Sequence, residues 1–196
     1  MAYFGLSHPW VAKLNTETET YSGGKKCGKA MSTSVTPNFN EGSLSADNQV
    51  QEKIAEFKDA AVAVGTDRVP VDMAEMIFGH KMDAEGSETA KVGDIAPYVG
   101  YGFIVQEVTD GMHSYRACIL LKVKFREGEE SYETKGESIV LKGSSLSGTA
   151  IGNSKGEWRK KSPKFDTEEE ADEWIRKILA PVPAVEAVSM GKDEEE

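Results

Sequence analysis

Apolar and polar residues alternate with a period of two through most of residues 1–165, which is typical of short antiparallel strands. The clearest unit consists of residues 99–105 and 115–125, which are separated by Thr109-Asp110-Gly111-Met112. An Asp-Gly pair between two such runs predicts a β-hairpin, because the turns that match strand twist need positive φ at their central residues.

The return strand of this hairpin is expected to have one buried and one solvent-exposed face. Leu121, Val123 and Phe125 are predicted to point toward the core, whereas Lys122 and Lys124 point toward water. This alternation favours a sheet that is covered on one side only.

Several other runs have strand character and are bounded by turn-forming residues. They are residues 10–15, 30–36, 60–64, 139–142 and 146–151. Gly23-Gly24 is expected to turn the chain back after the first of these strands. Gly100 and Gly102 lie in mid-strand, which indicates a close backbone approach or a bulge.

Two segments have helical patterns. Thr167 and Glu170 form a capping box, and the apolar stripe that follows predicts a helix that lies on the sheet and is anchored by Trp174, Ile175 and Ile178. A shorter helix is predicted over residues 73–78, with Asp72 as its N-cap and Gly79 as its stop.

The fold class that follows is α+β and mainly β, an antiparallel β-sandwich or half-barrel with a flanking helix at about residues 167–179. The formal net charge is −10, of which residues 166–179 and 180–196 contribute −4 each. We expect one β-domain over residues 1–180 and a disordered acidic tail over 181–196. The apolar runs fall short of the roughly 18 residues that span a bilayer, so no membrane association is expected.

Two polar segments do not resemble core. Residues 39–59 hold five acids and two bases, and residues 126–137 hold the same numbers. Polar stretches of this length are commonly functional. In a small β-domain they are candidates for a long hairpin or loop arm that reaches a neighbour.

Candidate chemistry is sparse. Familiar catalytic and phosphate-binding spacings are missing, and His8, His80 and His113 are interpreted as ordinary surface histidines. Cys27 and Cys118 are predicted to be reduced core residues, although the lysines near Cys27 favour a lowered thiol pKa there. We therefore predict no enzyme and no catalytic, cofactor-binding or metal-binding residues, and keep Cys27 as the least improbable nucleophile.

Six segments in a fixed order carry a family resemblance. They are Gly5-Leu6-Ser7-His8-Pro9, residues 28–38, the acidic stretch with Ala46-Asp47-Asn48, residues 98–103, residues 122–136, and residues 165–175. Together they resemble the major tail proteins of long-tailed bacteriophages of Gram-positive hosts, over about residues 5–179.

The resemblance implies a structural virion protein of the phage tail, assembled in the host cytoplasm. Its partners would be copies of itself, in hexameric rings stacked into a tube through which double-stranded DNA passes transiently. Tape-measure and tail-terminator or tail-tip proteins would be further partners. No cofactor is implied.

Site residues follow from combining this implication with the charge pattern. A lumen that lets DNA pass should be neutral or acidic, because cationic contacts hold phosphates. The expected lumen-facing acids are Glu41, Asp47, Glu52 and Glu56. The loop expected to contact the adjacent ring or subunit contains Glu127, Glu129, Glu130, Tyr132 and Glu133.

The alternative from another functional class is a β-sandwich recognition module that binds a host surface or a carbohydrate. Its exposed aromatic platforms would be Trp10, Trp158 and Tyr132.

Overall fold

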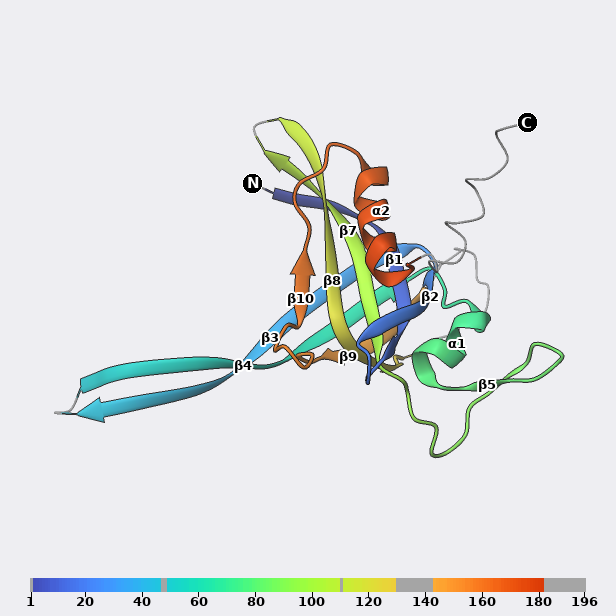
Figure 1. The fold of residues 1–196 in the computed structure, drawn as a ribbon, viewed down its shortest axis with the longest axis horizontal. Helices are drawn as coiled ribbons and strands as arrows, with labels where there is room; N and C mark the ends of the chain where they lie inside the picture. The colour runs from blue at the N-terminus through green and yellow to red at the C-terminus, as the bar shows by residue number, and fades with distance from the viewer. Residues whose placement is uncertain (1, 47–48, 110, 130–142, 182–196) are drawn as a thin grey trace, which may run out of the picture.

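The computed structural model describes residues 2–46, 49–109, 111–129 and 143–181. These residues form two helices and ten strands, in the order β1, β2, β3, β4, α1, β5, β6, β7, β8, β9, β10, α2 (Figure 1). Their bounds are β1 Ala2–Asn15, β2 Thr20–Lys26, β3 Ala30–Ala46, β4 Gln49–Thr66, α1 Val71–Phe78, β5 Lys81–Met82, β6 Glu88–Thr89, β7 Val99–Thr109, β8 Met112–Glu127, β9 Ser144–Ala150, β10 Arg159–Lys161 and α2 Glu168–Leu179. The α+β, mainly β class is confirmed.

One antiparallel sheet forms the body, in the order β2-β1-β7-β8-β9-β4-β3, with β10 pairing β8 beside the main path. The predicted β7–β8 hairpin is present, and Gly111 has φ +80°, as the turn requires. The strands predicted at 10–15, 30–36, 60–64 and 146–151 fall within β1, β3, β4 and β9, and three of them are much longer than predicted. The strand predicted at 139–142 lies outside the described residues.

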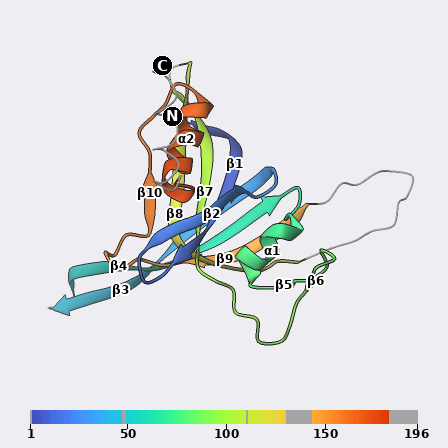
Figure 2. The ribbon, with the colours of Figure 1, turned by 45° about the vertical axis from the view of Figure 1, so that its right-hand side comes forward.

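The part of the sheet formed by β1, β7 and β8 is covered on both sides, which differs from the one-sided sheet expected from the sequence. The inner cluster joins five strands to α1 and includes Val11, Val62, Ile77, Tyr101, Leu120 and Phe125. The outer cluster joins β1, β7 and β8 to α2 and includes Trp10, Ile104, Ile119, Leu121, Ile175 and Leu179. Figure 2 shows α1 and α2 on different parts of the body.

A β-bulge in β8 explains why the two-face prediction for this strand is wrong in part. Val99 pairs with Val123 but Tyr101 pairs with Leu120, so β8 has one residue more than β7 between these pairs. Leu121 therefore packs in the outer cluster, whereas Val123 and Phe125 pack in the inner one.

Two local predictions need correction. Gly23-Gly24 lie inside β2, and the chain reverses at residues 16–19 instead. A Cβ on Gly24 would lie 2.4 Å from the carbonyl oxygen of Leu179, so this glycine lets the end of α2 approach the sheet. Helix α1 begins one residue before Asp72, after Pro70, and its Gly79 stop is confirmed with φ +81°.

Candidate functional site

The most prominent feature of the described structure is the far half of the β3–β4 hairpin, residues 39–46 and 49–57, which we call the arm. Figures 1 and 2 show it projecting from the body as a two-stranded ribbon. Strand β9 pairs with β4 only at Ala60–Thr66, so the arm has no further strand beside it among the described residues. A two-stranded ribbon is marginal in water by itself, and a free strand edge is a template for pairing with another chain.

Aromatic stacking fixes the base of the arm to the body. The rings of Phe57 and Trp158 are stacked at 4.6 Å, and Phe39 meets Phe57 edge-on at 6.3 Å. The guanidinium of Arg159 lies 4.4 Å from the centre of the Trp158 ring. The direction of the arm is therefore set by packing at its base.

The register of β3 and β4 divides the predicted lumen-facing acids between the two faces of the arm. Glu41 pairs with Ala55, and its carboxylate lies 2.9 Å from the Lys53 ammonium. Glu52 and Glu56 lie on the opposite face, on either side of the exposed Ile54. Glu52 and Glu56 therefore share one face of the arm, whereas Glu41 lies on the other face and forms an ion pair with Lys53.

The fourth predicted acid, Asp47, lies outside the described residues.

The outer surface of β3, β4 and β9 is built of small uncharged side chains. One cross-strand row is Ser34–Ala63–Ser147, and the next is Thr36–Ala61–Thr149. These side chains alternate with buried neighbours such as Val62 and Leu146, as a sheet with one covered face requires. Alternate residues of β3 share a face, so this surface of small side chains continues along the strand through Asn38 and Asn40. Asn40 pairs with Glu56, so the surface leads onto the arm face that carries Glu52 and Glu56.

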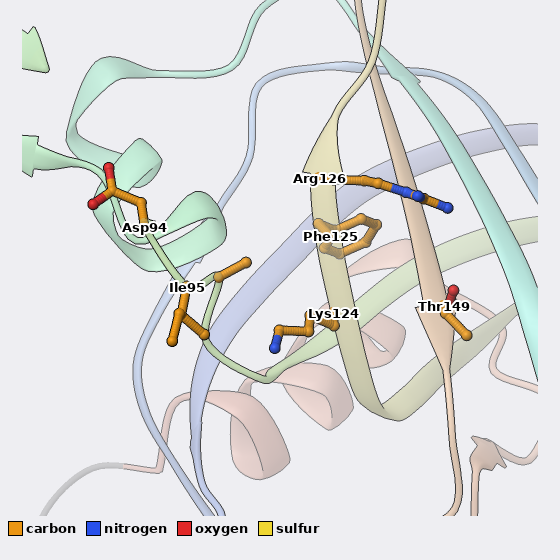
Figure 3. Close-up of a pocket in the computed structure, with 7 residues that line it drawn as sticks. Asp94, Ile95, Lys124, Phe125, Arg126 and Thr149 are labelled. Atoms are coloured by element: carbon orange, nitrogen blue, oxygen red, sulfur yellow. The ribbon is translucent and has the colours of Figure 1, made fainter. Parts of the chain in front are cut away.

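Strand β8 changes the charge of this surface. Arg126 and Lys124 extend the two rows just described, and they line an open depression of about 520 Å³ with Ile95 and Thr149 (Figure 3). The Lys124 ammonium also lies 5.2 Å from the centre of the Tyr98 ring. The lining combines these two cations with the carboxylate of Asp94 and the exposed Ile95. An open site of this mixed character suits the surface of another protein chain better than an enclosed small molecule.

The predicted contact loop is described only at its beginning. Glu127 ends β8 and Glu129 follows it, and both side chains are exposed. Glu130, Tyr132 and Glu133 lie outside the described residues.

Helix α2 packs as its apolar stripe predicts, but only one of the three predicted anchor residues is fully buried. Ile175 is fully buried, as are Ala171 and Leu179, whereas Trp174 and Ile178 are only half-buried. The Thr167 hydroxyl accepts a hydrogen bond from the Glu170 amide, which confirms the predicted cap.

Polar contacts also hold α2 to the sheet, and these were not predicted. The Trp10 indole donates a hydrogen bond to Asp172 at 2.7 Å, and the Lys26 ammonium lies 3.1 Å from the same carboxylate. Partial burial opposes ionisation of Asp172, but these contacts and His8 outweigh it and lower its pKa. Trp10 is buried in this arrangement, so the expectation that it forms an exposed recognition platform is wrong.

Cys27 lacks the environment of a reactive thiol. Burial, and then the negative charges of Asp67 and Asp72, raise the pKa of this thiol to about 11. The expectation that nearby lysines lower it is therefore wrong, whereas both cysteines are free and buried as predicted.

His80 is the one histidine whose position differs most from the prediction. It is 7% exposed rather than a surface residue, and its Nδ1 lies 2.5 Å from Glu88 Oε1 and 3.8 Å from Glu127 Oε1. The three residues come from separate elements, so their spacing along the chain gives no signal of the cluster.

A comparison with protein-family models and a comparison with curated proteins found no significant match to this chain. The described helices are also too short or too polar to cross a membrane.

Proposed function

We propose that the protein is a tail-tube subunit of a long-tailed bacteriophage, which assembles into hexameric rings that stack into the conduit for DNA ejection. The observation that carries the proposal is the outer edge of β3 along Ala30–Ala46, which pairs with no further strand within the described part of the chain, together with the arm that extends it beyond the body. Such an edge is completed when a strand of another copy pairs with it.

The apolar content of the arm supports contact with a second copy. Phe39 and Ile54 are large apolar residues, yet their side chains are 53% and 54% exposed. Cross-strand ribbons with exposed apolar side chains gain stability when a partner covers them. In the proposed ring, the neighbouring subunit provides that cover.

The uncharged surface of β3, β4 and β9 supports the proposed lumen. Ser, Thr and Ala side chains cannot hold phosphates by charge, so the rows Ser34–Ala63–Ser147 and Thr36–Ala61–Thr149 would let DNA pass. We assign this surface to the tube interior and the Lys124–Arg126 depression to a contact with a neighbouring subunit. Lys124 and Arg126 continue the same two rows on β8, so the neighbouring subunit would cover them and keep these cations away from the DNA path.

A tube of stacked rings would also need partner proteins that differ from the tube subunit. Rings that stack must end, so tail-terminator and tail-tip proteins would cap the tube and a tape-measure protein would occupy its lumen during assembly. The location of the protein would be the virion. The segment that begins at Glu127 and Glu129 would contact the adjacent ring.

Sedimentation velocity and negative-stain electron microscopy of concentrated protein test the proposal. Six-fold rings or tubes of uniform diameter are the expected result. A protein that stays monomeric at every concentration would contradict the proposal. If that monomer also binds an immobilised carbohydrate, the recognition module would be favoured instead.

A further inference from the structure

The His80 cluster has the composition and geometry of a cation site. His80 follows the Gly79 stop of α1, Glu88 lies on β6, and Glu127 is the last residue of β8. One imidazole nitrogen and one oxygen from each carboxylate all lie within 4.8 Å of one another. We propose that His80, Glu88 and Glu127 bind a divalent transition-metal ion of the zinc class.

The distances suit tetrahedral coordination. Zinc binds imidazole nitrogen and carboxylate oxygen at about 2.0–2.2 Å, which places neighbouring ligand atoms of a tetrahedron roughly 3.3–3.6 Å apart. The observed separations from His80 Nδ1, 2.5 Å to Glu88 and 3.8 Å to Glu127, lie on either side of this value. Small side-chain rotations therefore bring all three atoms to the required spacing.

Charge also favours a cation at this position. Within the residues that the structure describes, neither Glu88 nor Glu127 lies at ion-pair distance from a lysine or an arginine. Two carboxylates beside a buried imidazole repel each other unless a positive charge lies between them. A divalent ion supplies that charge and uses the mixed nitrogen and oxygen donors that zinc accepts.

The surroundings hold the ligands and leave room for a fourth. The ring of Phe78 lies 5.3 Å from the His80 ring and limits its movement. A cavity of about 90 Å³ lies beside the cluster, lined in part by Glu88, Glu127 and Ser145. This volume accommodates the water molecule that would complete four-fold coordination.

The bound ion would tie the β5–β6 hairpin more firmly to the body of the fold. The β5–β6 hairpin has only two residues in each strand and pairs with no strand of the main sheet. Coordination would attach this hairpin, and the end of α1, to the end of β8. Binding to the folded chain therefore raises its thermal stability.

Calorimetric titration of zinc chloride into the metal-free full-length protein tests the site. We expect one zinc ion per chain and an increase in Tm on binding. Glu127→Gln should weaken binding by at least about tenfold, because even outer-shell substitutions cost that much. Glu129→Gln is the matched control, since Glu129 is also exposed and lies outside the cluster, and it should bind as the wild type does.

Cobalt provides a second readout that does not depend on stability. Substitution with Co²⁺ should give the visible absorption of a four-coordinate site in the wild type and in Glu129→Gln, and lose it in Glu127→Gln and Glu88→Gln. Absence of stoichiometric binding would overturn the proposal and leave the cluster as a histidine–carboxylate hydrogen bond. Equal zinc binding by all variants would also overturn the proposal, because the metal would then be bound elsewhere, for example at His8 or His113. Neither outcome depends on the tube assembly.

Discussion

The hydroxyl of Thr33 and the phenol of Tyr101 lie 2.7 Å apart, although three strands separate β3 from β7 in the order of the sheet. This contact requires the sheet to curl until its two distant strands face each other across the inner cluster. Tyr101 is 1% exposed, so the hydrogen bond lies at the edge of the core and satisfies a phenol that has little access to water. The curl fixes the position of β3, and with it the direction of the free edge and the arm.

Tyr101→Phe tests the contribution of this contact to stability. The variant leaves the ring in place and removes one hydroxyl, so we expect a decrease of about 0.5–1.5 kcal/mol in the free energy of unfolding. Urea denaturation of the wild type, Tyr101→Phe, Thr33→Val and the double variant gives the coupling between the two groups. Additive effects would show that the hydroxyls do not interact in solution.

Asp172 makes the attachment of α2 dependent on pH. Its pKa is lower in the folded protein than in the unfolded chain, so its stabilising effect is fully present above about pH 4 and is lost as the pH falls through the folded value. Asp172→Asn should therefore reduce the free energy of unfolding by about 1–2 kcal/mol at pH 7.

The difference between Asp172→Asn and the wild type should become smaller in acid, where the wild-type carboxyl is protonated as well. Chemical denaturation at pH 7, 5 and 3 measures this trend. Glu173→Gln is the control, because Glu173 is exposed on the same helix and its nearest cation is Lys177 at 3.9 Å. A difference that stays constant between pH 7 and 3 would contradict the assignment.

Cys27 should be unreactive in the native protein. Its thiol is 1% exposed and has a pKa of about 11, so the thiolate fraction at pH 8 is about one in a thousand and access is blocked. We expect iodoacetamide to modify Cys27 only after denaturation, as measured by mass spectrometry of tryptic peptides. Rapid stoichiometric alkylation under native conditions would restore the thiol nucleophile as a candidate.

Ile54→Lys tests whether the arm makes the proposed contact between copies. The side chain is exposed, so the free energy of unfolding of the monomer should change by no more than about 0.5 kcal/mol. Ring and tube formation should be lost, because a charge would be buried in the interface. Val92→Lys is the matched control, since Val92 is fully exposed and lies off the arm. Equal assembly by both variants would remove Ile54 from the interface.

Patterns within short segments located eight of the twelve helices and strands of the described residues, at least in part, and missed β2, β5, β6 and β10. The Asp-Gly turn located the β7–β8 hairpin, and the Thr167–Glu170 pair located the start of α2, because both signals depend on residues close together in the chain. Gly100 and Gly102 were also interpreted correctly as points of close approach: a Cβ on Gly100 would lie 2.5 Å from Tyr21, and one on Gly102 would lie 3.0 Å from Ile175.

Features that depend on distant residues were missed or misread. The β8 bulge reverses the direction of Leu121 relative to Val123, and a count of alternating residues cannot locate it. The position of His80 beside Glu127 depends on how α1 packs against β8. The length of the arm was visible only as an acidic, weakly apolar stretch, since Phe57 is the one arm residue, among those described, that packs against a hydrophobic core cluster.

Hydrogen exchange along β3 is the most direct test of the claim that other copies complete the sheet. Alternate backbone amides of this strand point away from β4, the strand that pairs it in the described structure. We predict that these amides exchange rapidly in dilute protein and become strongly protected in concentrated or polymerised samples, while amides of the buried β7 stay protected throughout. Rapid exchange of the β3 edge in every sample, up to millimolar protein, would contradict the account.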